Sequence, residues 1–303
     1  RTRWIGRCKI MKLRPSMMFV PGNNPGMLQN AGVYGADTII LDVEDAVAVT
    51  EKDAARHLIA EAIKTMKYKQ EVAVRINHIR TPYGEDDLNV ILPSKPDLIR
   101  LPVAECADDI ISVDQIITEA EKKYGFEAGS IKMMGAIETA KGLFNAREII
   151  AASPRMVALA IGGEDFVADL RTTRTAHGKE LFVAKSHIVL AARAEGVMAI
   201  DTVYSDVNNE VGFRDDLQLA KDLGFDGKSV INPRQIAIVH EVFSPSEKEL
   251  DYAKRVLAAF EEALAKKSGV IALDGKMIDK PIVDRAKRML AYGEAVSGRK
   301  GGA

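Results

Sequence analysis

The sequence is poor in the residues that build disulfide frameworks and histidine metal sites. Among its 303 residues there are two cysteines and five histidines. Cys8 and Cys106 form no CxxC pair and no zinc-ligand spacing, so we expect reduced thiols without a structural role, as in a cytoplasmic protein. The histidines form no HxxxH or HxH pair, which argues against a metal centre built on histidine.

Long apolar runs and an excess of one charge are also absent. No run approaches the roughly 20 residues that a membrane-spanning helix requires. Lysine and arginine number 42 and aspartate and glutamate 43, which gives a formal net charge of -1. This balance argues against nucleic acid or an anionic membrane as the main partner. Because 47% of the residues are hydrophobic, the chain can fill the core of one large α/β barrel or of two ordinary domains.

The first residues are basic. Residues 1–14 hold six lysines and arginines and no acidic residue. Organelle-targeting peptides share this composition, but the serines and a clear amphipathic period are missing here. We therefore expect residues 1–13 to form a flexible leader.

Short apolar runs alternate with amphipathic segments from Ser16 onward. The runs have the length and composition of buried parallel strands, and the segments between them have helical spacing. Eight strands, seven of them followed by a clear helical stretch, predict a (β/α)8 TIM barrel over residues 14–243, whereas a strand fewer would leave an open sheet. The predicted strands cover residues 17–20, 38–43, 72–77, 97–102, 131–137, 157–161, 197–203 and 227–233.

The last sixty residues follow the predicted barrel. Ser244-Pro245-Ser246-Glu247 has the composition of a helix start, and a helix to about residue 267 is expected after it. Asp274 and Gly275 then indicate a turn before a last helix. A turn and helix beyond a complete barrel suit a lid or an arm, so we expect residues 244–303 to form a C-terminal helical extension that reaches a neighbouring subunit.

Polar residues stand at the carboxyl ends of several predicted strands. Residues 157–166 show this most clearly, because five apolar residues run into two glycines, two carboxylates and an aromatic. Since the carboxyl ends of parallel strands meet on one rim of a barrel, these side chains should face one cavity. The set consists of Glu44, Asp45, Arg75, Asn77, Glu138, Glu164, Asp165 and Asp201.

The acidic residues of this set predict a cation. Several carboxylates in one cavity repel one another unless a cation shares the site. Oxygen ligands without histidine or thiolate suit Mg²⁺ or Mn²⁺. Glu138 and Asp165 are the expected ligands, because Glu138 directly ends a strand and Asp165 closely follows a glycine pair. Arg75 offers a fork that can hold a carboxylate bidentately, and a salt bridge to the rim acids is its alternative role.

These motifs, in the order in which they stand, resemble the citrate lyase β-subunit family. That family belongs to the aldolase superfamily of metal-dependent (β/α)8 enzymes that act on acyl-thioesters and 2-oxo acids. The resemblance runs from Arg14 to the last helix. It rests on SMMFVPGN at 16–23, LDVEDAV at 41–47, VRIN at 74–77, AIET at 136–139, GEDF at 163–166, the segments 201–210 and 224–233, and GKMID at 275–279.

The resemblance implies roles for individual residues. Glu138 and Asp165 would bind Mg²⁺, and Arg75 would grip a carboxylate of the oxo-acid, with Asn77 and Glu138 as further substrate contacts. Asp279 would act as an acid or base from a neighbouring subunit.

Two further segments gain roles from the same resemblance. Phe19 and the turn of Pro21 and Gly22 would lie along the thioester carrier. Glu44 and Asp45 would hold magnesium-bound waters or the substrate, with Glu44 in a catalytic role.

The activity expected from the resemblance is cleavage of a (3S)-citryl thioester, carried by CoA or an acyl-carrier protein, to oxaloacetate and an acetyl thioester. The citrate lyase α and acyl-carrier subunits, and a trimeric or hexameric homo-oligomer, would be its partners. Citramalyl-CoA or malyl-CoA lyases and malate synthase-like thioesterases share the metal and arginine motifs, so they are the main alternative. The segments 206–210 and 228–233 favour citrate lyase. A pyruvate-type class II aldolase and a non-catalytic subunit are the remaining alternatives.

Overall fold

The computed structural model describes residues 12–175, 177–265 and 272–300. The chain divides into two compact units, residues 1–240 and residues 241–303, and each is described by itself.

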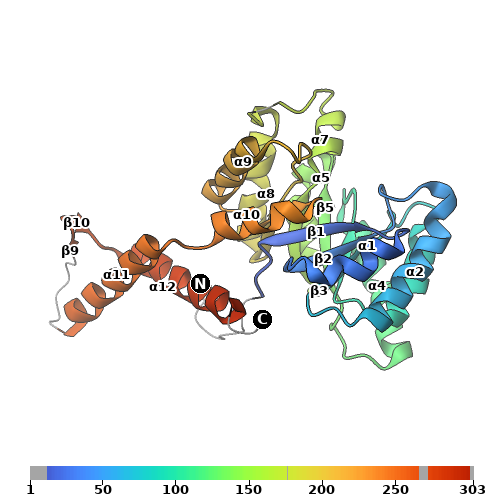
Figure 1. The fold of residues 1–303 in the computed structure, drawn as a ribbon, viewed down its shortest axis with the longest axis horizontal. Coiled ribbons are helices and arrows are strands. Elements are labelled where there is room, and N and C mark those ends of the chain that lie inside the picture. Colours follow the sequence, from blue (N-terminus) through green and yellow to red (C-terminus); the bar gives the residue numbers. More distant parts are fainter. Residues whose placement is uncertain (1–11, 176, 266–271, 301–303) are drawn as a thin grey trace. The chain divides into compact units, whose positions relative to one another are not determined.

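A closed barrel of eight parallel strands, in the order of the sequence, forms the first unit (Figure 1). The barrel closes where β8 pairs with β1. All eight predicted strands are present, and the predicted (β/α)8 fold is confirmed. The strands are β1 Ser16–Pro21, β2 Thr38–Asp42, β3 Glu71–Arg75, β4 Leu98–Leu101, β5 Lys132–Ile137, β6 Met156–Ile161, β7 Met198–Asp201 and β8 Gly227–Val230.

Helices follow every strand and enclose the barrel (Figure 1). Three of the long helices end at glycines in the left-handed conformation, Gly125, Gly196 and Gly224, which is the usual helix stop. The α-helices are α1 Pro25–Asn30, α2 Lys52–Met66, α3 Gly84–Ile91, α4 Ala107–Tyr124, α5 Ala140–Phe144, α6 Ala146–Ala151, α7 Gly163–Asp169, α8 Phe182–Glu195, α9 Glu210–Leu223 and α10 Pro233–Phe243. The 3-10 helices are η1 Ala31–Val33, η2 Val49–Glu51, η3 Leu92–Ser94 and η4 Lys179–Leu181.

The barrel interior is filled by alternate side chains of the strands, because successive residues of a strand point to opposite faces. Large residues such as Met17, Ile40 and Leu98 pack here against small ones. On β5 and β6 the interior residues include Ala136, Ala158 and Ala160. These small side chains leave room for long ones from other strands.

The start of the barrel is anchored by charge. Residues 1–11 of the expected leader lie outside the described residues. Packing is already present at the next two positions, where Lys12 Nζ lies 3.0 Å from Glu71 Oε1 and Leu13 is buried. Arg14 then holds the same carboxylate with two hydrogen bonds of 2.6 and 2.7 Å. Residues 12 and 13 therefore belong with the barrel rather than with a leader.

Two helices and a small hairpin form the second unit. Ser246 and Glu249 make a reciprocal capping box before the first helix, as the predicted helix start requires. Ile278 and Val283 are buried with residues of that helix in an apolar cluster of their own. The elements are α11 Glu247–Ala265, β9 Ala272–Leu273, β10 Lys276–Met277 and α12 Lys280–Lys300.

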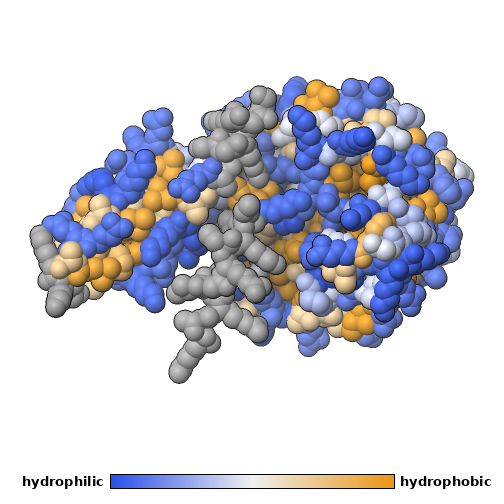
Figure 2. All heavy atoms as spheres, turned by 90° about the horizontal axis from the view of Figure 1, so that it is seen from below, coloured by the Kyte–Doolittle hydropathy of each residue, from blue (hydrophilic) through white to orange (hydrophobic). Residues whose placement is uncertain are grey.

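The surface is mixed in character. Figure 2 shows hydrophilic residues spread over the face in view, with hydrophobic areas between them. In the described part of the chain, no helix combines the length and the apolar character that crossing a membrane requires.

Candidate active site

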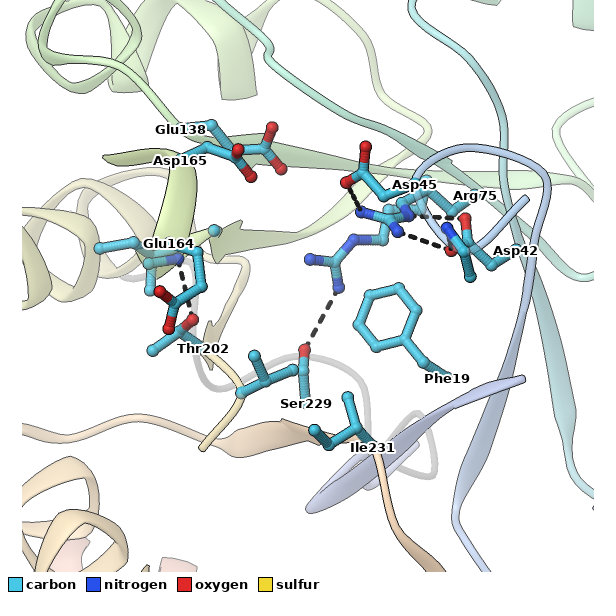
Figure 3. Close-up of a pocket in the computed structure, with 16 residues that line it drawn as sticks. Phe19, Asp42, Asp45, Arg75, Glu138, Glu164, Asp165, Thr202, Ser229 and Ile231 are labelled. Carbon is cyan, nitrogen blue, oxygen red and sulfur yellow. Dashed lines mark hydrogen bonds and ion pairs between the residues drawn. The ribbon is translucent and has the colours of Figure 1, made fainter. Parts of the chain in front are cut away.

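A cavity of about 330 Å³ opens where the barrel strands end. Strand ends and the loops after them supply its walls, so it lies where (β/α)8 enzymes carry their chemistry. Phe19, Ile161, Val203 and Ile231 are apolar parts of the lining. The charged and hydroxyl-bearing lining residues are Asp42, Asp45, Arg75, Arg100, Glu138, Glu164, Asp165, Thr202 and Ser229 (Figure 3).

Glu138 directly follows β5 and is 3% exposed. Its Oε2 accepts a hydrogen bond of 3.2 Å from the backbone N–H of Val103, which stands at a φ of +47°, a conformation that a β-branched residue rarely adopts. Burial raises the pKa of Glu138 to about 7, Arg100 opposes this rise, and the charge of Asp165 adds to it. The carboxyl is therefore held in place next to another acid.

Gly162 has no side chain, and this leaves the space that Glu138 occupies. A Cβ atom added to Gly162 would lie 2.5 Å from Glu138 Cγ and 2.7 Å from Oε1. The first of the two glycines after β6 is thus needed for space. Gly163, the second, donates its N–H to Thr202 Oγ1 at 2.8 Å and begins α7.

Asp165 lies in the first turn of α7 and faces the same cavity (Figure 3). Burial, with the charge of Asp45 in second place, raises its pKa. No group of three or more His, Cys, Asp or Glu side chains among the described residues is arranged to hold a metal. The chain thus offers two carboxylates, Glu138 and Asp165, whose repulsion a cation would relieve. Mg²⁺ binds in this way, with water and substrate oxygens as its other ligands, so the donor set fits it.

Arg75, the last residue of β3, is held by the rim acids. It stands in register with Asp42 of β2, and its Nε and Nη2 donate to the two oxygens of that carboxylate at 2.7 and 2.6 Å (Figure 3). Its Nη1 lies 2.9 Å from Glu44 and 3.1 Å from Asp45. The salt bridge to the rim acids is therefore present in this structure. Asp42, which the sequence analysis did not single out, is its main partner.

Glu44 and Asp45, the two acids next to Nη1 of Arg75, are the partners that a substrate carboxylate can replace. Burial raises the pKa of Glu44 to about 8 although Arg75 lowers it, so the carboxyl is protonated for much of the time at neutral pH. The side chain of Asp45 is 65% exposed. A substrate carboxylate can compete with both for Nη1, while Asp42 keeps the rest of the fork in position.

Asn77, Pro21 and Gly22 do not line this cavity. Asn77 is buried, and its Nδ2 donates to Asp87 at 2.7 Å and to the carbonyl of Val43 at 3.2 Å. Its side chain organises the loop after β3, and its expected contact with the substrate stays a prediction. Gly22 is buried too and donates its N–H to the Asp42 carbonyl at 2.8 Å. Pro21 ends β1 and is half-buried.

Asp201 points away from the expected rim. It is fully buried and receives hydrogen bonds from Lys185 at 3.1 Å and Lys228 at 2.6 Å. Asp216 of α9 also bonds both lysines. The four residues form a buried charge cluster behind β7 and β8. Thr202, one residue further on, faces the cavity in place of Asp201.

Arg100 is the main residue that the sequence analysis missed. It lies on β4 beside Arg75 in the strand register, is 3% exposed and lines the cavity. Neighbouring residues of a parallel ladder face the same side. An arginine at the end of the strand after Arg75 was therefore the signal that could have revealed it.

Asp279, the expected acid or base, belongs to the second unit. It is exposed and its Oδ1 accepts a hydrogen bond of 3.2 Å from the N–H of Ile282, at the start of α12. Its catalytic role stays a prediction.

Comparisons with known proteins show the family of this chain. The profile of the HpcH/HpaI aldolase/citrate lyase family matches residues 15–233. The citrate lyase subunit beta of Leuconostoc mesenteroides subsp. cremoris is 48% identical over 285 residues, which is 94% of each chain. A (3S)-malyl-CoA thioesterase of Cereibacter sphaeroides is 36% identical and covers 93% of this chain and 95% of its own.

A solved structure shows the same fold. The protein CitE of Mycobacterium tuberculosis, in complex with magnesium, acetoacetate and coenzyme A, is similar with a TM-score of 0.77 and 31% identity. The match covers 93% of this chain and 98% of that one. The chain belongs to the HpcH/HpaI aldolase/citrate lyase family.

Proposed function

We propose that this chain is a Mg²⁺-dependent carbon–carbon lyase that cleaves a (3S)-citryl thioester to oxaloacetate and an acetyl thioester, as the β subunit of a citrate lyase. The main support is the pair of carboxylates, Glu138, which is buried, and Asp165, which is exposed, at the carboxyl end of a barrel that also carries two arginines in its cavity. The likeness to a citrate lyase β subunit over 94% of both chains supports the same substrate.

Cleavage of the citryl group poses two problems. The substrate hydroxyl must lose its proton as the carbon–carbon bond breaks, and the electron pair of that bond passes to the acetyl carbon, which must then take up a proton. Mg²⁺, held by Glu138 and Asp165, would lower the pKa of the hydroxyl and stabilise the negative charge that develops on its oxygen.

The side chains of the protein position the substrate and move protons. Arg75 binds a substrate carboxylate through Nη1 and fixes its orientation. Burial raises the pKa of Glu44 to about 8, so its ionised fraction at neutral pH is a stronger base than an ordinary carboxylate and accepts the hydroxyl proton. Asp279 delivers the proton to the acetyl carbon. Phe19 forms part of the wall along which the thioester carrier enters.

The carrier is CoA or an acyl-carrier protein, the α and acyl-carrier subunits of citrate lyase are the other components, and the enzyme acts in the cytoplasm. Residues 244–303 reach a neighbouring subunit in a homo-oligomer and bring Asp279 to its site. The carboxylate of Asp279 is exposed at the start of α12, where it accepts one hydrogen bond from Ile282 N–H, and this exposure suits such a role.

Malyl-CoA or citramalyl-CoA is the competing substrate class. The likeness to a malyl-CoA thioesterase at 36% identity supports it, but less strongly than 48% supports citrate lyase. A pyruvate-type aldolase would use the same two carboxylates to hold the metal, but its substrate would not be a thioester. A non-catalytic subunit is disfavoured because the acids and Arg75 are intact.

Cleavage of citryl-CoA, malyl-CoA and citramalyl-CoA with and without Mg²⁺ tests the proposal. We expect citryl-CoA to be the best substrate, and we expect EDTA, Glu138→Gln and Asp165→Asn each to abolish its cleavage in a folded protein. Full activity of either variant in EDTA would refute the metal site. A preference for malyl-CoA would refute the substrate.

A further inference from the structure

Arg100 reaches across the barrel interior. It starts on β4, and its Nη1 donates to Ser229 Oγ of β8, on the opposite wall, at 3.3 Å, the bond that Figure 3 marks at Ser229. Small interior residues of β5 and β6, Ala136 and Ala160 among them, leave the room that this path needs. The guanidinium carbon lies 5.0 Å from the centre of the Phe19 ring. Arg100 is therefore held as part of the cavity wall.

The charge of Arg100 has no partner in the described part of the chain. Its Nε is buried without a hydrogen bond, and no carboxylate lies within 4.0 Å of the guanidinium. Its Nη1 donates to a hydroxyl and to a thioether sulfur, those of Ser229 and Met134. Other buried arginines have carboxylates at 2.6–2.9 Å, in the pairs Arg14–Glu71, Arg56–Asp87 and Arg155–Glu121. A buried charge without a partner is costly, which indicates that a ligand supplies the partner.

The charges of the cavity point to an anionic ligand group. Asp42 pairs with Arg75, and a divalent cation would balance Glu138 and Asp165. Two other acids line the cavity, but Asp45 lies against Arg75 and Glu164 against Arg174. Among the described residues, Arg100 is left at the cavity wall with no carboxylate within 4.0 Å. A carboxylate fits the fork of a guanidinium bidentately and would satisfy both its charge and its free Nε.

We propose that Arg100 is the specificity-determining residue for the second carboxylate of the substrate, the one on its carboxymethyl arm. This inference rests on the proposed function. A citryl thioester keeps two free carboxylates, one beside the hydroxyl and one on the arm, whereas malyl and citramalyl thioesters have only the first. The same two carboxylates are present in oxaloacetate, and pyruvate lacks the second. Arg100 thus selects a dicarboxylic 2-oxo acid.

The test compares oxaloacetate with pyruvate. Calorimetric titrations with Mg²⁺ present should show that Arg100→Met weakens oxaloacetate binding at least about tenfold, about 1.4 kcal/mol, with pyruvate binding within about twofold of wild type. Arg100→Lys should lie between the two, because it keeps the charge and loses the fork. Arg147→Met, at an exposed arginine paired with Glu195, is the control and should change neither affinity.

The outcomes separate this inference from the proposed function. If Arg100→Met and Arg100→Lys leave the ratio of oxaloacetate to pyruvate affinity unchanged, or lower both affinities equally, Arg100 does not select the second carboxylate. That result stands whether or not wild type cleaves citryl-CoA. If wild type cleaves no citryl-CoA but the ratio falls in both variants, the proposed function fails and the role of Arg100 holds. If Arg100→Met does not fold, the ratio of oxaloacetate to pyruvate affinity is measured in Arg100→Lys and in Ser229→Ala instead. Ser229→Ala removes the hydrogen bond that holds the guanidinium of Arg100.

Discussion

The space that Gly162 leaves for Glu138 can be tested by one methyl group. In Gly162→Ala the new Cβ would lie 2.5 Å from Glu138 Cγ, about 1 Å inside normal carbon–carbon contact. The backbone of Gly162, at φ -95° and ψ 95°, accepts alanine, so the clash between side chains is the only expected strain.

The size of the loss in Mg²⁺ affinity depends on how far the Glu138 side chain can move. Its Oε2 is tied to Val103 N–H, so the carboxyl must leave that bond to escape the methyl group. Overpacking of this kind costs about 1–3 kcal/mol. The metal-free variant relaxes by moving the carboxyl, and Mg²⁺ binding must pull it back. We therefore expect the Mg²⁺ affinity to fall by about fivefold to 150-fold, which is that cost converted at 1.4 kcal/mol for each tenfold change.

The assay is a calorimetric Mg²⁺ titration with oxaloacetate present, beside thermal unfolding. Gly135→Ala is the matched control, because Gly135 also lies in the barrel at β5 but its nearest neighbours would be at 3.4–3.5 Å from a Cβ, which is near ordinary contact. If Gly162→Ala binds Mg²⁺ as tightly as Gly135→Ala does, Glu138 is not confined in the way described or does not bind the metal.

Four further predictions address single groups. Arg75→Lys keeps the charge and loses the fork, so oxaloacetate binding should weaken by about tenfold or more, and an unchanged Kd would leave the arginine a purely structural role. Below the Glu138 pKa of about 7, Mg²⁺ must displace a proton from this carboxyl, so the Mg²⁺ affinity should be about tenfold lower at pH 6 than at pH 8. A Mg²⁺ affinity that does not change between these pH values would contradict this. Asp201→Asn leaves two buried lysines with one carboxylate and should cost about 3–5 kcal/mol, a loss of roughly 10 °C in Tm, whereas a shift of a degree or two would mean that the site relaxes. Asp279→Asn should bind Mg²⁺ and oxaloacetate normally but lose turnover, and mixing it with Asp165→Asn should restore partial activity unless the two residues serve the same subunit's site.

Strand positions were predictable because the signal is local. Each strand of the barrel is a short apolar run, buried on both faces, and turn or helix residues follow it at once. The residues just beyond each run, Glu138 and Asp165 among them, could be assigned to one rim for the same reason. Parallel order around the barrel then brings these two to one cavity.

The direction of single side chains could not be predicted in this way. Asp201 and Thr202 are adjacent, so only one of them can face the cavity, and nothing local decides which. Arg100 stands in an apolar run, where it looks like an outward-facing interruption until its register with Arg75 is known. Asp42 gains its role from the same ladder, since it lies opposite Arg75.

The buried charge cluster restricts the sequence changes that this chain can accept. Asp201 and Lys228 form one of the two register pairs that join β7 to β8, so the cluster stands at a short seam of the barrel. Neutralising any one of its four members leaves an unmatched buried charge, and this holds for each of the four. Replacing all four together by apolar side chains of similar volume is expected to be neutral or stabilising. Because each lysine pairs with both aspartates, a change at one position is tolerated only together with a change at a residue of opposite charge, which leaves one matched pair.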